Sequence, residues 1–186
     1  MHGIALRIKP YTIALLALAF ATVSSVVSFA HEQEINPIRE QTVFHEDEEF
    51  QHPVPLPSKA LEALLRTKEV KNALEFASKE QRDDPSGLFQ AAEVHLRGLN
   101  EVDLVVEGFP PVSGADNTWF WVVVSPHTAP RVVLWTGGDS LTLLPSRANG
   151  YRDIMCSWSS SSGDTREWKY RFNGKRYFLW KETNSR

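Results

Sequence analysis

Aromatic and cationic residues alternate near the end of the chain, in WKYRFNGKRYFLWKE at residues 168–182. Aromatic rings attract Lys and Arg side chains, and rings with neighbouring charges can bind a glycan or an acidic protein segment. The sequence therefore predicts a basic and aromatic ligand-binding surface here. Its candidate residues are Lys169, Arg171, Arg176, Phe178 and Trp180.

The Asn173-Gly174 pair between these runs predicts a hairpin with a two-residue type I′ turn. Such a turn places Tyr170 opposite Tyr177 and Arg171 opposite Arg176, because residues on paired strands share a face. One face then holds Trp168, Tyr170, Phe172, Tyr177 and Leu179, which we expect in the core. The other face holds the five candidate residues. The alternative is that this second face is also covered, by helices or by a second sheet.

Carboxylates are the second group with chemical potential. Two of them at a suitable distance cleave glycosidic bonds, and the folded region offers Asp103, Glu107, Asp116, Asp139 and Asp153. Nothing in the sequence brings two of them together. GxSxG and SxxK motifs are absent, and Gly137-Gly138 lies between two predicted strands, which indicates a hairpin turn. The sequence therefore predicts no catalytic residue.

His and acidic residues gather in HEDEEFQH at residues 45–52. Their spacing matches neither the HExxH motif of zinc sites nor the Asp-rich loop of EF-hands. A run of like charges usually stays solvated. We therefore expect no metal site and no cofactor.

The chain divides into three segments. Residues 1–30 carry Arg7 and Lys9 before an apolar run and small residues, the pattern of a secretory signal peptide. Residues 31–57 are acidic and contain prolines, so we expect a disordered tether. Residues 58–186 form a single domain. The predicted location is periplasmic or extracellular, without stable membrane insertion after cleavage. The net charge of −3 gives no basis for nucleic-acid binding.

The folded region begins with helical periodicity and continues with strands. Ser58 and Thr67 can cap two short helices, and alternating apolar runs follow. These runs are residues 93–96, 102–107, 119–124, 131–135, 140–144, 151–158, 168–172 and 175–180. Short turns between them imply antiparallel pairing. The expected class is α+β: short N-terminal helices packed on an antiparallel sheet or a small two-layer sandwich. Cys156, the single cysteine, is expected to be buried and inert.

The segments EVHL, DLVV, WFWVVV, NGYRDI and YRFNGKRY follow one another in the C-terminal half. In this order the chain resembles a group of exported bacterial proteins with GYxDI and YRFxGKRY-like stretches. The resemblance implies export but no site residue. The leading hypothesis is an exported envelope protein that binds or inhibits a protein or glycan partner. The alternative is a hydrolase whose carboxylate pair the sequence does not locate.

Overall fold

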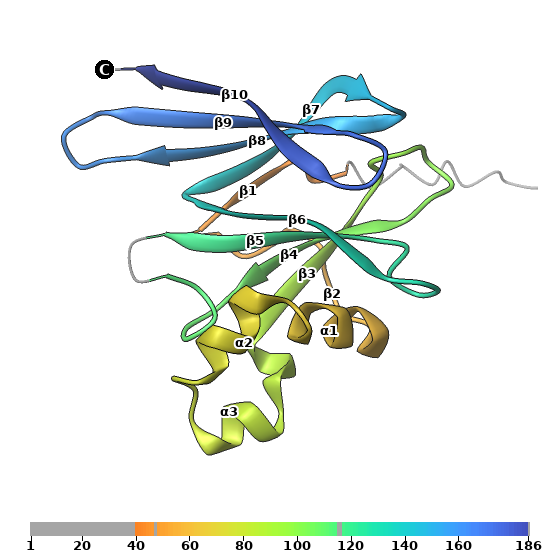
Figure 1. Ribbon diagram of the computed structural model, residues 1–186, viewed down its shortest axis with the longest axis vertical. Coiled ribbons are helices and arrows are strands. Elements are labelled where there is room, and N and C mark those ends of the chain that lie inside the picture. The colour runs from red at the N-terminus through yellow and green to blue at the C-terminus, as the bar shows by residue number, and fades with distance from the viewer. Residues whose placement is uncertain (1–39, 47, 115–116, 186) are drawn as a thin grey trace, which may run out of the picture. The chain divides into compact units, whose positions relative to one another are not determined.

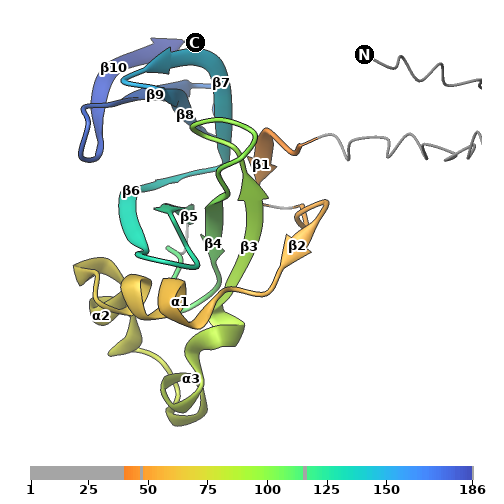
Figure 2. The same ribbon diagram turned by 90° about the vertical axis from the view of Figure 1, so that its right-hand side faces the viewer.

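A computed structural model describes residues 40–46, 48–114 and 117–185. The predicted signal peptide and residues 31–39 of the predicted tether lie outside these ranges, as does Asp116. The described chain forms two antiparallel sheets of five strands each, stacked as layers (Figures 1 and 2). Sheet A has the strand order β1-β7-β8-β9-β10, and sheet B has the order β2-β3-β4-β5-β6.

The strands of sheet A are β1 (Val43–His45), β7 (Ser140–Ala148), β8 (Tyr151–Ser159), β9 (Thr165–Phe172) and β10 (Tyr177–Ser185). Those of sheet B are β2 (Pro53–Val54), β3 (Phe89–Val94), β4 (Asp103–Gly108), β5 (Thr118–Val124) and β6 (Arg131–Gly138). The sequence located the eight longer strands and their antiparallel pairing.

The predicted α+β class is wrong. Strands hold 47% of the described residues and helices 17%. The helices are α1 (Ser58–Leu65), α2 (Lys68–Leu74), α3 (Lys79–Asp83) and the 3₁₀ helix η1 (Pro85–Leu88). The main core lies between the two sheets. Side chains alternate between the two faces of each strand, and one face of each sheet packs against the other sheet. The protein is therefore mostly β.

Side-chain caps mark the start of α2 and α3 but not of α1. Thr67 caps α2, since its Oγ1 accepts a hydrogen bond from the N–H of Val70 at 3.4 Å, and the predicted break between two helices is confirmed. Ser58 is instead the first residue of α1 and makes no cap. Ala60, Leu64, Val70 and Ala73 of α1 and α2 belong to a buried cluster with the outer-face residues of sheet B.

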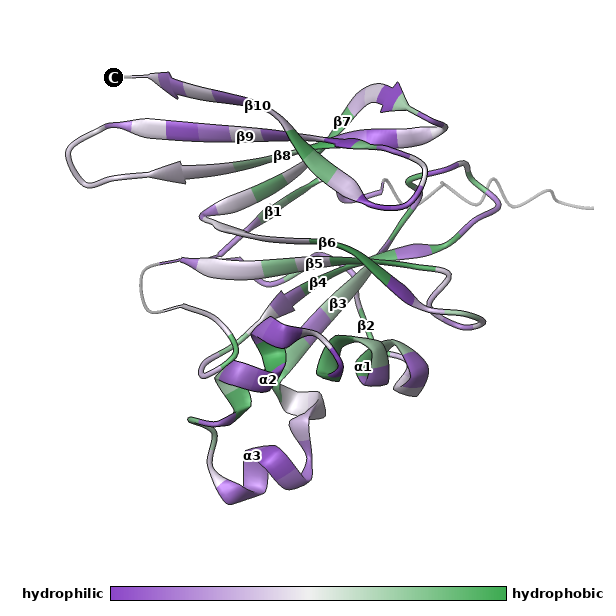
Figure 3. Cartoon of the chain, viewed as in Figure 1, coloured by the Kyte–Doolittle hydropathy of each residue, from purple (hydrophilic) through white to green (hydrophobic). Residues whose placement is uncertain are grey.

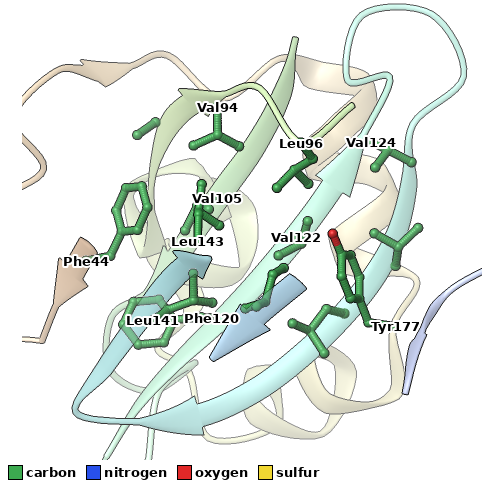
Figure 4. Packing of buried hydrophobic residues seen from close by; sticks show 14 of the residues in the cluster. Phe44, Val94, Leu96, Val105, Phe120, Val122, Val124, Leu141, Leu143 and Tyr177 are labelled. Atoms are coloured by element: carbon green, nitrogen blue, oxygen red, sulfur yellow. The ribbon is translucent and has the colours of Figure 1, made fainter. Parts of the chain in front are cut away.

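The inter-sheet core combines residues far apart in sequence. Phe44, Val105, Phe120, Leu141 and Tyr177 come from five different strands and point into the same layer (Figure 4). Cys156 is fully buried as predicted, and burial raises the pKa of its thiol to about 11. The thiol is therefore protonated and inert at neutral pH.

The acidic segment contributes to this core from residue 40 onward. β1 pairs with β7, and the side chains of Phe44 and Phe50 are 0% and 2% exposed. Glu40 forms an ion pair with Arg152 at 2.9 Å. Over residues 40–57, apart from the undescribed residue 47, the predicted disordered tether is therefore wrong. Two buried phenylalanines hold this segment in place despite its charge.

The chain passes from sheet B to sheet A through one residue, Asp139. Gly138 makes this passage compact, since a Cβ there would lie 2.5 Å from the Ser157 carbonyl oxygen and 2.6 Å from the Cys156 sulfur. Asp139 N–H donates to that carbonyl at 2.8 Å. The predicted hairpin turn at Gly137-Gly138 is therefore wrong: the two glycines end one sheet where it meets the other.

The β9–β10 hairpin has a four-residue loop, Asn173–Arg176, rather than the predicted two-residue turn. Phe172 pairs with Tyr177, and the Asn173 Oδ1 accepts the Arg176 N–H at 3.0 Å. The register therefore differs from the prediction by two residues. Because side chains alternate with a period of two, Arg171 and Phe172 stay on their predicted faces. Leu179 was expected in the core, but its side chain is 49% exposed.

Replacing Phe44 by Ala tests whether the acidic segment stabilises the fold. Loss of a fully buried ring should lower the free energy of unfolding by about 3–5 kcal/mol. The neighbouring Val43, 38% exposed, is the control, and Val43→Ala should cost under about 1 kcal/mol. Urea denaturation followed by tryptophan fluorescence measures both. Equal, small effects would mean that the segment does not support the core.

Candidate functional site

The outer face of sheet A carries four of the five predicted basic and aromatic residues. Phe172 and Tyr177 are in the inter-sheet core, so Arg171 and Phe178, which pair with each other on β9 and β10, point away from sheet B. Much of β9 is drawn in the purple of hydrophilic residues in Figure 3. We call Lys169, Arg171, Phe178, Trp180 and Lys181 the outer patch.

Arg171 is the centre of the outer patch. Its guanidinium carbon lies 3.6 Å from the ring centroid of Trp180, a close cation–π stack. Its Nε donates to the Asp153 Oδ2 at 3.5 Å. The terminal nitrogens of Arg171 have no hydrogen-bond partner in the described part of the chain. The guanidinium is thus held through its flat face by Trp180 and through its Nε edge by Asp153, and its terminal nitrogens are available to a ligand.

Trp180 lies at a β-bulge of the edge strand β10. The pairing of β9 and β10 shifts between Leu179 and Lys181, which leaves Trp180 as the extra residue of a bulge. Trp180 and Phe178 are 49% and 43% exposed. The outer face is therefore open here, and the alternative that helices or a second sheet cover it does not hold.

The other two predicted residues differ in position. Lys169 pairs with Lys181 across β9 and β10, and its Nζ lies 4.0 Å from a carboxylate oxygen of Glu167. Both lysines extend the positive charge along the outer patch. Arg176 is exposed in the β9–β10 loop. The prediction that Arg176 pairs with Arg171 is wrong, because Arg171 pairs with Phe178.

Asp153 belongs to the candidate site, although the sequence did not connect this acid with the basic and aromatic residues. It is 3% exposed, and its Oδ2 accepts from the Ser146 hydroxyl at 2.8 Å as well as from Arg171. Its Oδ1 is buried without a hydrogen-bond partner among the described residues. A buried carboxylate beneath the Arg171 guanidinium stabilises the cation in its stacked position.

Trp168 was expected in the core but is only half-buried and belongs to neither buried cluster. Tyr170 packs against the inter-sheet core as expected, and its hydroxyl shares a 2.9 Å hydrogen bond with Thr136 of the opposite sheet. Trp158 on the neighbouring strand β8 is likewise half-buried and outside both clusters.

The four candidate acids within the described residues have separate partners. Asp103 is fully buried in a two-bond ion pair with Arg97, while Glu107 lies at the opposite end of the same strand. Asp139 accepts the Ser159 N–H at 2.5 Å. These contacts are typical of structural carboxylates.

Glu107 has the most altered environment among these acids. It is 2% exposed and accepts a hydrogen bond from the Gln90 amide. Burial raises the pKa of Glu107 to about 7, and the Glu46 carboxylate adds to this effect. A cavity of about 450 Å³ adjoins it, lined by Gln90, Phe109 and three glutamates, Glu46, Glu48 and Glu49.

Comparisons of the chain with protein-family models, with curated protein sequences and with solved structures find no match. Within residues 40–185, leaving aside the undescribed positions, no three His, Cys, Asp or Glu side chains are grouped to hold a metal ion. No helix in the same ranges is long and apolar enough to cross a membrane. The geometry of the sites therefore carries the functional argument.

Glu107→Gln should remove a pH-dependent destabilisation. Below pH 4.5 the Glu107 carboxyl is protonated in both the folded and the unfolded chain. Between pH 4.5 and about 7 the unfolded chain loses the proton and the folded chain keeps it, so wild-type stability falls as pH rises. The variant should therefore match the wild type at pH 4 and exceed it by roughly 3 kcal/mol at pH 8.

Urea denaturation at a series of pH values measures this difference. Glu93→Gln, at an exposed position of the neighbouring strand β3, is the control and should show no such trend. A pH-independent difference between Glu107→Gln and the wild type would contradict the raised pKa.

Proposed function

We propose that the protein is an exported binding protein of the bacterial envelope, and that the outer patch holds an acidic, extended segment of a partner protein. The observation that carries the proposal is the stack of Arg171 on the half-exposed ring of Trp180, at 3.6 Å. The pattern of residues 1–30 and the resemblance to exported bacterial proteins support export.

The fixed orientation of Arg171 favours carboxylate binding. A guanidinium donates two parallel hydrogen bonds to a carboxylate, and this geometry is lost if the side chain rotates freely. The Trp180 ring and Asp153 restrict that rotation before a ligand arrives. Less side-chain entropy is then lost on binding.

The charge of the hairpin favours an acidic partner. Residues 165–185 contain six Lys or Arg and two Glu, a net charge of +4, whereas the whole chain has a net charge of −3. Lys169 and Lys181 lie beside Arg171 on the same face. A local positive surface on an acidic protein attracts anionic segments and orients their approach.

A protein segment fits this surface better than a glycan. Sugars stack on an open aromatic face, and Arg171 covers one face of Trp180. β10 is the edge strand of sheet A, so its outward backbone groups have no strand partner in the described chain. An extended segment can lie along such an edge while its acidic side chains reach the cations.

Binding of a defined peptide tests the proposal. The probe is a fluorescein-labelled peptide of alternating Glu and Val, measured by fluorescence anisotropy against the chain from residue 31 onward. Arg171→Ala and Trp180→Ala should each weaken binding about 10-fold, as expected for loss of a charge-assisted contact or its support. Trp180→Ala should change the melting temperature little, because its ring lies at the surface. Arg171→Ala should lower the melting temperature, because the buried Asp153 carboxylate loses its cation.

Three controls define the outcome. Lys59→Ala removes a charge on α1, away from the hairpin, and should bind as wild type. A Gln-Val peptide should bind weakly, and added salt should weaken Glu-Val binding. The proposal fails if the acidic peptide does not bind, or if Arg171→Ala and Trp180→Ala bind it as well as Lys59→Ala does.

Hydrolysis is a second candidate, favoured by one observation. A carboxyl with a pKa of about 7 is suited to general-acid catalysis, and Glu107 lies near Glu46 beside a cavity. Glu107 itself is buried behind Gln90, however, and a general acid must reach the bond that it cleaves. Binding is therefore the better supported function.

Release of reducing ends from soluble polysaccharides tests the second candidate. If Glu107 is a general acid, wild-type protein should release them and Glu107→Gln should be at least about 100-fold slower, the usual contribution of acid catalysis. The absence of release by the wild type, or equal rates for both proteins, would exclude this role of Glu107.

A further inference from the structure

A cavity of about 510 Å³ lies between the β8–β9 loop and the C-terminal end of β10. Ligand sites for small molecules usually have volumes of roughly 300–1,000 Å³. Trp158, Ser162, Asp164, Arg166 and Asn184 are among its lining residues. In Figure 1 the β8–β9 loop and the C-terminal end of β10 lie at the same end of sheet A, on the left of the view.

The register explains how these residues meet. Trp158 of β8 pairs with Arg166 of β9, and Arg166 pairs with Asn184 of β10. Three neighbouring strands thus place an indole, a guanidinium and an amide in one row on the inner face of sheet A. This face is turned away from the outer patch.

Trp158 lies outside the two buried clusters of the described chain. Its side chain is half-buried. Arg166 lies 5.9 Å from the centroid of its ring, compared with 3.6 Å for Arg171 over Trp180. Arg166 therefore stacks on the Trp158 ring less closely than Arg171 stacks on the Trp180 ring.

The loop beside Trp158 is fixed by its own hydrogen bonds. Ser160 N–H donates to the Asp164 carbonyl at 2.8 Å, and Asp164 N–H donates to the Ser160 hydroxyl at 3.1 Å. The Ser162 hydroxyl donates to the Asp164 carboxylate at 3.2 Å, and Gly163 takes a positive φ of 88°. The hydroxyl and carboxylate groups of the loop are thus held in place before a ligand arrives.

We propose that this cavity is a binding site for a neutral oligosaccharide. A pyranose ring has an apolar face that packs on an indole and a rim of hydroxyls that pair with carboxylate, amide and hydroxyl groups, and this cavity supplies each of these. Among the described residues of the lining, Arg166 and Asp164 are charged, and their charges have opposite signs. The described lining is therefore neutral overall, which favours an uncharged sugar over a uronate or a phosphate.

This site is independent of the proposed function of the outer patch. The two lie on opposite faces of sheet A, and their central tryptophans, Trp158 and Trp180, are on different strands. A protein with both sites can hold a glycan on one face and a protein segment on the other. Failure of one site leaves the other testable.

Titration with soluble oligosaccharides tests the saccharide site. The probes are the tetrasaccharides of cellulose, chitin, starch and mannan, together with trigalacturonate, each followed by calorimetry and tryptophan fluorescence. At least one neutral probe should bind, and Trp158→Ala should weaken it at least about 10-fold. Asn184→Ala should weaken it less, and it serves as a second variant if Trp158→Ala is poorly folded.

Two variants are the matched controls. Trp135→Ala removes another partly exposed tryptophan, on β6 of sheet B, and Arg171→Ala disables the outer patch; both should bind the sugar as wild type does. The proposal is overturned if no neutral probe binds at millimolar concentration. It is also overturned if trigalacturonate binds more tightly than every neutral probe, or if Trp158→Ala and Asn184→Ala both leave binding unchanged.

Discussion

The close approach of β6 to β8 is the contact on which the sandwich depends. Gly138, at the end of sheet B, lies so close to Cys156 and Ser157 of sheet A that there is no room for a side chain at this position. One residue, Asp139, then carries the chain across, and its N–H and carboxylate both bind β8. Because the crossing is so short, the two sheets face each other here at a fixed separation and register. The packing of the inner faces follows from this junction.

Sheet A carries both candidate ligand sites. On its inner face the side chains of Trp158 and Trp168, near the crossing, are half-buried. Within the described residues, the outer face has no layer over Arg171, Phe178 and Trp180, and the two rings are exposed. Strand alternation then sorts aromatic and charged residues onto two separate surfaces. Both candidate ligand sites thus lie on one sheet, on its two opposite faces.

Local patterns in the sequence predicted the strands but not how they combine. Alternation locates β3 to β10, because each strand buries one face. The sequence does not distinguish a hairpin from a crossing at TGGD, since both require glycine. Asn149-Gly150 forms a two-residue turn with both φ values positive, whereas the identical pair at Asn173 lies in a longer loop in which the Asn173 side chain binds the backbone. The same dipeptide therefore has two outcomes, which tertiary packing decides.

The pairing of β1 with β7 also has a consequence for the order of folding. Val43 and Thr142 are about 100 residues apart in sequence, yet they are neighbours in sheet A. Closing so long a loop is slow relative to forming hairpins, and β7 to β10 follow one another by local turns. We expect the C-terminal meander to assemble first and the segment around Phe44 to join late. Until then the rim of the inner layer is exposed to water, and the partly folded chain presents an unpaired edge of β7 to other chains.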